Sequence, residues 1–324
     1  MLEVRVTEDR IFIGERFSVS FQRTLRVPES YRASKLPPGF GPLPVQRVAD
    51  YADRVPATWK PDAVMIPLDA REAMWLSFNA ASWKPNAVKV GVGEINAISG
   101  EAWSSTLSDD PQNYVVCPLQ LWLDGINAGE NFVRQFVAVP LGQGYTVESQ
   151  VNRGVETGGL RIMVFEPKPG LFPDQAPANS PLAGVMRSFS PGEFGVGAGA
   201  RIEQRIYPDP YGVETWDSTA MSEVFVYLVS RERFREITGR EAPRSPIGAR
   251  EYTEYGLGPW FELMDKSLGD IAAPENLSQL QSVNQRDVEE GRAAPDEETE
   301  FEVDPTKVKR IRHHAEKDDS NESS

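Results

Sequence analysis

The stretch AVKVGVGEI (87–95) decides the fold class, because its residues alternate with a period of two. In an extended chain the valines point to one face, while Lys89, Gly91 and Gly93 point to the other. We expect the valine face to be buried. The glycines on the opposite face leave room for a close approach by another group. The stretch therefore predicts a β-strand with one buried face.

Similar runs lie on both sides of this stretch. They are short, rich in β-branched or aromatic residues and bounded by turn residues, as strands are. The clearest are AMWLSF (73–78), YVVC (114–117), FVRQFVAV (132–139), LRIMVFE (160–166), ARIEQRIY (200–207) and EVFVYLVS (223–230). Nearer the start of the chain, Phe17, Val19 and Phe21 alternate with serines. The short spacing predicts a mainly β body, a sandwich or barrel-like antiparallel sheets.

Two short helices are expected near the C-terminal end of this body, within residues 230–256. Ser230 can cap RERFREIT, and Gly239 can end that helix. The second helix is expected in GAREYTEY, before Gly256.

Two segments rich in glycine or proline interrupt the strand pattern. LPPGFGPLPV (36–45) predicts an ordered crossing loop without regular structure, packed on the body through its Leu, Phe and Val side chains. FGVGAGA (194–200) has a G-x-G-x-G spacing and no helix after it, unlike a dinucleotide-binding loop. We expect a flexible hairpin or loop there, rather than a phosphate site.

The chain divides by composition into a body, residues 1–284, and a charged tail, residues 285–324. From Arg286 to Ser324 there are thirteen acidic and seven basic residues, with few apolar ones, which predicts disorder. The segment KVKRIRHHAEK (307–317) could be a short interaction motif within that tail. A division of the body into two β subdomains near residues 167–200 is the competing layout.

The residues that most enzymes use are scarce. The chain has two histidines, His313 and His314, both in the predicted tail, and one cysteine, Cys117. A Ser–His–Asp triad or a Cys–His pair needs an imidazole in the folded body, and most zinc sites need clusters of histidine or cysteine. No catalytic residue, metal ligand or cofactor site is predicted, and carboxylate chemistry is the catalytic device that composition leaves open.

The densest polar and aromatic stretch runs from Cys117 to Gln150 and holds the first candidate site. Trp122 and Asp124 stand at a turn, and Arg134 and Gln135 lie on opposite faces of a strand. The four form a candidate binding pocket, or else a structural bond that ties a turn to a strand. A buried Arg134 needs a partner, which we expect to be Asp124 or Glu148.

Trp260 and Phe261 form a second candidate. They follow Gly256-Leu-Gly-Pro259, a turn that would fix both rings in place. The pair either docks into the core or stands exposed to bind a partner.

These features favour a soluble binding or assembly protein without evident catalytic machinery. A protein partner or self-association is expected, and the net charge of −14 argues against nucleic acid. No apolar stretch of membrane-spanning length and no signal-peptide pattern is seen, so we expect a cytoplasmic protein outside the membrane. The alternative is a carboxylate-dependent hydrolase or carbohydrate-active enzyme. Its acids would come from Glu94, Asp124, Glu148 and Asp217, with tryptophans as sugar platforms.

The segments WLDGI (122–126), VRQFVAVPLGQGYTVESQ (133–150), GGL (158–160), EITG (236–239) and PWFELMD (259–265) carry a resemblance. Over roughly residues 10–270 the chain resembles a widespread family of bacterial proteins of unknown function. The resemblance implies a soluble body and transfers no functional residue to this chain.

Overall fold

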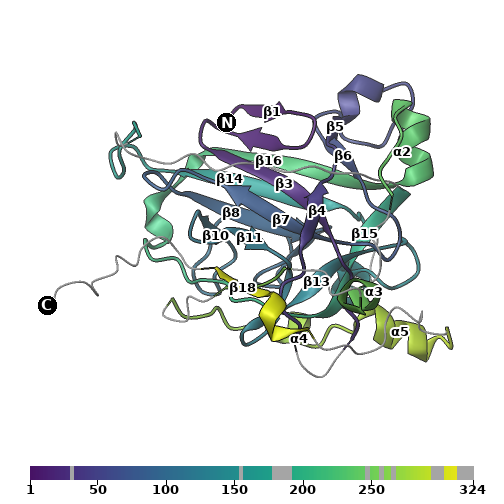
Figure 1. The fold of residues 1–324 in the computed structure, drawn as a ribbon. Coiled ribbons are helices and arrows are strands. Elements are labelled where there is room, and N and C mark those ends of the chain that lie inside the picture. Colours follow the sequence, from purple (N-terminus) through teal and green to yellow (C-terminus); the bar gives the residue numbers. More distant parts are fainter. Residues whose placement is uncertain are drawn as a thin grey trace, which may run out of the picture.

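The computed structural model of the chain describes residues 1–29, 33–152, 156–176, 192–244, 249–254, 259–263, 268–292 and 303–311. Within these ranges the protein is mainly β, and most neighbouring strands run antiparallel (Figure 1). The predicted fold class is therefore confirmed. The described strands pair along an open path from β1 (Val4–Val6) to β10 (Val115–Cys117), so they form no closed barrel.

The strands fall into two layers. The first follows the order β1, β2 (Ile11–Ile13), β3 (Phe17–Thr24), β7 (Ala73–Asn79), β13 (Phe132–Val139) and β15 (Gly192–Glu203). Three short strands pair with β3, β7 and β13 respectively: β4 (Gly39–Pro42), β11 (Trp122–Leu123) and β12 (Gly125–Gly129).

The second layer follows the order β6 (Val64–Pro67), β16 (Trp216–Ser230), β14 (Leu160–Pro167), β8 (Asn86–Val92) and β10. β5 (Gln46–Arg47) pairs with β6, and β9 (Ile95–Asn96) pairs with β8. β15 links the layers, because its start pairs with β16 and the rest of it pairs with β13.

The main core lies between the layers. Strands that do not pair with each other share one buried cluster, which includes Val19, Phe21 and Leu76 of the first layer and Val90, Ile162 and Val226 of the second. The predicted alternation in β8 is confirmed, since Val88, Val90 and Val92 all lie in this cluster. On the opposite face of β8, a Cβ added to Gly91 would lie 2.7 Å from the Trp103 ring. The glycine thus permits the predicted close approach.

The glycine-rich segment 194–200 is part of strand β15, so the prediction of a hairpin or loop was wrong. Val196, Ala198 and Ala200 alternate into the core as strand residues do. The glycines between them leave space for β13, because a Cβ on Gly199 would lie 2.6 Å from the Val137 side chain. The pattern that suggested flexibility therefore reflects close strand packing.

Both predicted helices are present, α2 (Arg231–Thr238) and α3 (Ala249–Glu254). The Ser230 hydroxyl accepts a hydrogen bond from the Arg233 N–H at 3.2 Å, and Gly239 ends α2 with a φ of 70°. Three further helices are α1 (Val147–Asn152), α4 (Glu275–Ser278) and α5 (Val283–Glu289). The 3-10 turns are η1 (Val48–Tyr51), η2 (Val213–Thr215) and η4 (Pro305–Lys307).

Segment 36–45 packs on the body as predicted, since Leu36, Leu43 and Val45 are buried. The expected lack of regular structure was wrong, because the segment contains β4, paired with β3. Leu36 also exchanges two backbone hydrogen bonds with Phe261, of 2.9 and 3.0 Å. Phe261 lies in β17 (Trp260–Leu263), which runs parallel to β18 (Val308–Ile311).

The predicted boundary between body and tail, at residue 285, falls inside helix α5. α5 contains residues on both sides of it and packs on the body through buried Val283 and Asp287. Further along, residues 308–311 form β18. These segments pair with or pack on distant parts of the chain, which composition does not reveal. His313 and His314, like residues 177–191 of the expected division, lie outside the described residues.

Candidate functional site

The first layer carries an aromatic surface on the side that faces away from the core. In β7, Met74, Leu76 and Phe78 point into the core, and Trp75, Ser77 and Asn79 alternate with them and stay partly exposed. Trp122 of β11 is the register partner of Ser77. The rings of Trp75 and Trp122 lie 6.2 Å apart between their centroids. We call Trp75, Ser77, Asn79 and Trp122 the tryptophan face.

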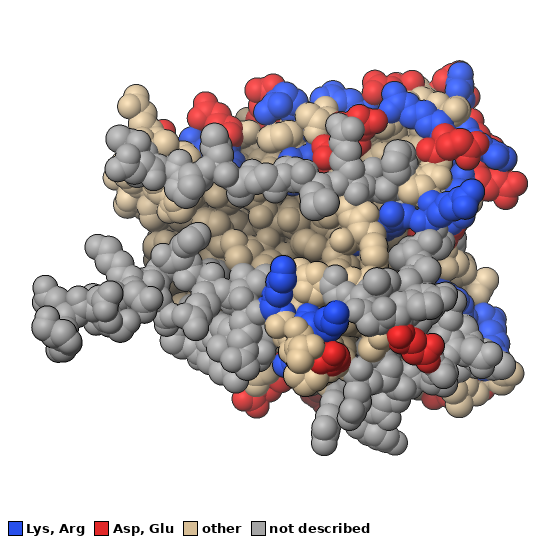
Figure 2. Space-filling model, in the orientation of Figure 1, with Lys and Arg blue, Asp and Glu red and all other residues tan. Residues whose placement is uncertain are grey.

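Figure 2 shows a hollowed band without charged side chains across the middle of the molecule, at the level of β7 and β11 in Figure 1. Lysines, arginines and acids gather above it, over the β1 and α2 side of the molecule. Uncharged surface of this kind stands out on a chain with a net charge of −14.

The corresponding side of the neighbouring strand β3 is closed. The Arg10 guanidinium donates to the hydroxyls of Ser18 and Ser20, at 2.9 and 3.3 Å. The Gln22 amide also donates to Ser20, at 2.9 Å. All residues of β3 are buried, so the accessible part of this side of the layer begins at β7.

Asp124 lies directly behind the tryptophan face and is 2% exposed. The Gln204 side chain donates to the Asp124 carboxylate at 2.9 Å and accepts the Asp124 N–H at 2.8 Å. The Trp122 side chain also hydrogen-bonds the carboxylate. Burial raises the pKa of Asp124 to about 7, although these two hydrogen bonds lower it. Asp124 therefore supports Trp122 from inside.

Gln120 supports Trp122 from a second direction. Its buried amide donates to the Trp122 carbonyl at 3.0 Å and to the Arg205 carbonyl at 3.2 Å, and its oxygen accepts the Tyr207 N–H. With Gln204, it ties β11 to the segment after β15. Neither glutamine was among the predicted site residues, because a separation of 80 residues or more leaves no local pattern.

Arg134 is buried, as the sequence analysis allowed, but the expected partners were wrong. Its guanidinium contacts Glu29 at 3.4 Å and the Gly199 carbonyl at 3.2 Å, whereas Asp124 and Glu148 bind other groups. The pairing of β13 with β15 shifts register between Arg134 and Phe136. Such a bulge re-aims side chains, which a strict alternation cannot anticipate.

Gln135 is a structural residue in this arrangement. Its side chain accepts the Val27 N–H at 3.2 Å and donates to the Leu25 carbonyl at 2.8 Å. These two hydrogen bonds satisfy backbone groups of the segment that follows β3.

Glu148 caps a different group of backbone donors. Its carboxylate accepts the N–H groups of Glu94, Gly158 and Thr157 at 2.7, 2.8 and 3.3 Å. Burial raises its pKa, against these hydrogen bonds. Its lone pairs are thus already used by the backbone.

The second candidate pair lies at the main core. Trp260 is 1% exposed and belongs to the main core. It contacts the Tyr252 ring edge-on, with centroids 6.3 Å apart. Phe261 is half-buried and packs against the same core. The structure thus gives Trp260 a docking position in the core.

Cofactor chemistry and thiol chemistry find no support in the described residues. Among the described residues, no three His, Cys, Asp or Glu side chains gather as metal ligands would. No helix in the described part of the chain has the length and apolar character needed to cross a membrane. Cys117 is buried, and burial raises the pKa of its thiol well above the usual value, so the reactive thiolate is disfavoured.

Comparison of the chain with protein-family models, with curated proteins and with solved structures gave no match. Of the first four predicted residues, Trp122 is partly exposed, while Asp124, Arg134 and Gln135 are buried, and Asp124 alone of these three bonds to Trp122. The arrangement can offer a binding surface and leaves no predicted polar group free for chemistry.

Proposed function

We propose that the protein is a non-enzymatic binding or assembly protein that takes a protein partner on the tryptophan face. One observation carries the proposal. Trp122 is partly exposed, and the polar side chains behind it already make hydrogen bonds that hold its strand. Asp124, Gln120 and Gln204 all serve to hold this strand in place.

Such support favours binding because it pre-organises the anchor. A tryptophan that is already fixed by its neighbours loses little conformational entropy when a partner packs on it. Tryptophan is also the residue type most enriched among the dominant contacts of protein interfaces. Trp75 beside it enlarges the apolar surface.

The chemistry of the tryptophan face defines the partner. The face contains no charged side chain, and its polar groups are the Ser77 hydroxyl, the Asn79 amide and the two indole N–H groups. A partner segment with apolar or aromatic side chains and few charges fits this surface, since charged groups would lose hydration without gaining an ion pair. A second copy of the chain is one such partner.

Trp122→Ala tests the proposal, with Tyr211→Ala as the matched control. Tyr211 is an aromatic residue that is 46% exposed and contacts Phe172 and Trp216, away from β7 and β11. Sedimentation over a range of concentrations would measure self-association, and affinity capture would identify partners. We expect Trp122→Ala to lose the complex that wild-type protein and Tyr211→Ala both form. A wild-type protein that stays monomeric and captures nothing reproducibly would refute the proposal.

The alternative, a carboxylate-dependent hydrolase or carbohydrate-active enzyme, gains less support. It needs two carboxylates that face one cleft, roughly 5–10 Å apart. Asp124 and Glu148 are buried and bonded as described, and Glu94 pairs with Arg161. Asp217 accepts hydrogen bonds from Thr219 within its own turn. We therefore favour binding, in the cytoplasmic location that the single, buried cysteine fits.

A further inference from the structure

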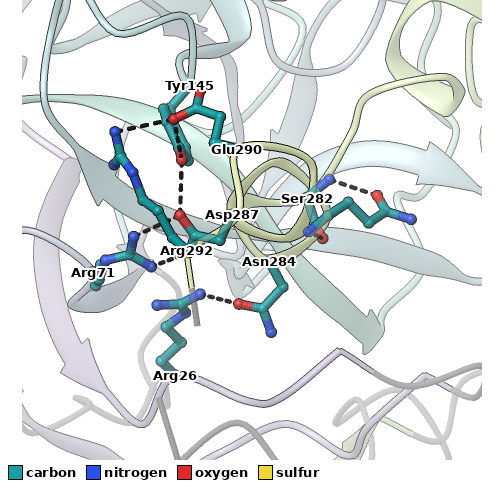
Figure 3. Close-up of polar contacts among 9 residues, drawn as sticks. Arg26, Arg71, Tyr145, Ser282, Asn284, Asp287, Glu290 and Arg292 are labelled. Atoms are coloured by element: carbon teal, nitrogen blue, oxygen red, sulfur yellow. Dashed lines mark hydrogen bonds and ion pairs between the residues drawn. The ribbon is translucent and has the colours of Figure 1, made fainter. Parts of the chain in front are cut away.

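Helix α5 carries a carboxylate into the protein. Asp287 is 0% exposed, and both of its oxygens bind the Arg71 guanidinium, one of them at 2.7 Å. The Tyr145 hydroxyl donates to the same carboxylate at 2.8 Å (Figure 3). This bidentate pairing is the geometry in which arginine recognises carboxylates most strongly.

The groups that receive Asp287 belong to two separate parts of the body. Arg71 lies in the turn between β6 and β7, and Tyr145 lies between β13 and α1. Arg71 has a φ of 68°, a left-handed conformation that is unfavourable for a residue with a side chain. Its N–H donates to the Ala138 carbonyl at 2.7 Å, which holds the turn against β13. The turn thus fixes the direction of the guanidinium at a conformational cost.

More cations surround the same point. The Arg26 guanidinium donates to Asn284 of α5 at 2.7 Å. Arg286 and Arg292 each lie 5.5 Å from the centre of the Tyr145 ring. Glu290 accepts a second hydrogen bond from the Tyr145 hydroxyl at 3.2 Å. Arginines outnumber acids here, which favours an anion between Arg71 and Tyr145.

α5 has other contacts that hold it in place without Asp287. Val283 packs in a buried apolar cluster with Ala73, Val137, Val139 and Tyr145. Ser282 and Gln285 form a capping box at the start of the helix. Removal of the Asp287 carboxylate should therefore leave the helix docked, with a space of one carboxyl group between Arg71 and Tyr145.

We propose that Arg71 and Tyr145, with Arg26 beside them, form a carboxylate-binding site of the body, and that α5 supplies Asp287 as its built-in ligand. The site would attach the segment that follows residue 283 to the body. The Arg71 side chain is 34% exposed, which gives a small carboxylate a route from solvent. This inference is independent of the tryptophan face.

Chemical rescue tests the site. We expect Asp287→Ala to melt at a lower temperature than wild type, and formate to raise that temperature by at least about 2 °C relative to equal chloride. Formate has the size of the deleted group. Pivalate, a bulky carboxylate, should fail to rescue, and wild-type protein should not respond because its site is filled.

A second variant separates the site from general salt effects. Asp287→Ala combined with Arg71→Gly lacks the guanidinium, while glycine suits the left-handed backbone at that position. This double variant should lose the response to formate. Equal stabilisation by chloride, no stabilisation by formate, or a full response in the double variant would each overturn the proposal. If Asp287→Ala does not fold in chloride, its refolding yield is compared between formate and chloride. A higher yield in formate supports the proposal, and equal yields overturn it.

Discussion

The outer sides of the two layers use the same residue types with opposite results. On the second layer, Lys89 and Arg161 both lie near one aromatic ring, 5.4 and 5.8 Å from the Trp103 ring centre. Arg161 also lies 5.5 Å from the Phe225 ring. On the first layer, Trp75 and Trp122 meet each other and stay half-exposed.

The aromatic series on the second layer continues beyond Phe225. Tyr227 lies 4.6 Å from Phe225 and stacks on Trp59 at 4.1 Å, with their planes 6° apart. Lys89 is 1% exposed and donates to the carbonyls of Ser104 and Thr106, which fixes the loop that covers β8. Trp103 itself stays partly exposed, and with its loop it covers Lys89 of β8.

The difference shows that a tryptophan on the outer side of a layer has no fixed role. On the second layer, Trp103 belongs to the loop between β9 and β10, and Gly91 makes room for its ring against β8. On the first layer, the polar groups behind Trp122 hold the strand but cover nothing in front of it. The covered side should therefore matter for stability, and the open side for binding.

The largest expected effect is on the covered side. Lys89→Ala should lower the free energy of unfolding by about 3 kcal/mol, because it removes packing, leaves the Ser104 carbonyl without the Lys89 donor and leaves the Thr106 carbonyl with the Asn113 amide alone. Chemical denaturation monitored by circular dichroism would measure it. A loss below about 1 kcal/mol would mean that the loop is held without Lys89.

The pH dependence of stability tests the support behind the open side. The folded pKa of Asp124, about 7, lies above the usual 3.8, so the folded state binds the proton more tightly and wild type loses stability as pH rises through that window. Asp124→Asn does not titrate. Its stability relative to wild type should rise by about 1 kcal/mol per pH unit between pH 4 and 7 and then level off. Parallel curves for the two proteins would contradict the raised pKa.

Trp75→Ala should cost less stability than Lys89→Ala, about 1–2 kcal/mol, because the Trp75 side chain already contacts water. Denaturation of the two variants under one condition compares the sides directly. An equal or larger cost at Trp75 would place it among the covered residues and remove the contrast.

The smallest effect on stability is expected at Asn79, the exposed end of the tryptophan face. Asn79→Asp should change the free energy of unfolding by no more than about 0.5 kcal/mol, since exposed surface substitutions are mild. The same change introduces a charge into the uncharged surface and should weaken partner capture. Unchanged capture would argue that the partner does not reach this end of β7.

Much of the fold could be predicted from local pattern. Period-two runs marked β7, β8, β13, β14 and β16, and the cap at Ser230 with Gly239 marked α2. The glycines of β15 misled the prediction, because a missing side chain signals either flexibility or close packing. The contact with Val137 decides between the two, and it joins residues more than 60 positions apart.

The candidate site shows the same limit more strongly. Trp122 and Asp124 are close in sequence, and their shared importance could be predicted. Gln204 as the partner of Asp124, Glu29 as the partner of Arg134, and Arg71 as the partner of Asp287 could not. Each pair forms only after distant strands and helices have docked.

By itself, the sequence determined the strand pattern, the two short helices near residues 230–256 and the scarcity of histidine and cysteine. These features depend on composition and on neighbours within a few residues. Only the tertiary structure decided which strand Trp103 covers, that helix α5 continues past residue 285, and which buried charges pair. Such choices depend on contacts between residues far apart in the chain, and a buried charge takes whichever partner the packed fold brings within hydrogen-bond distance.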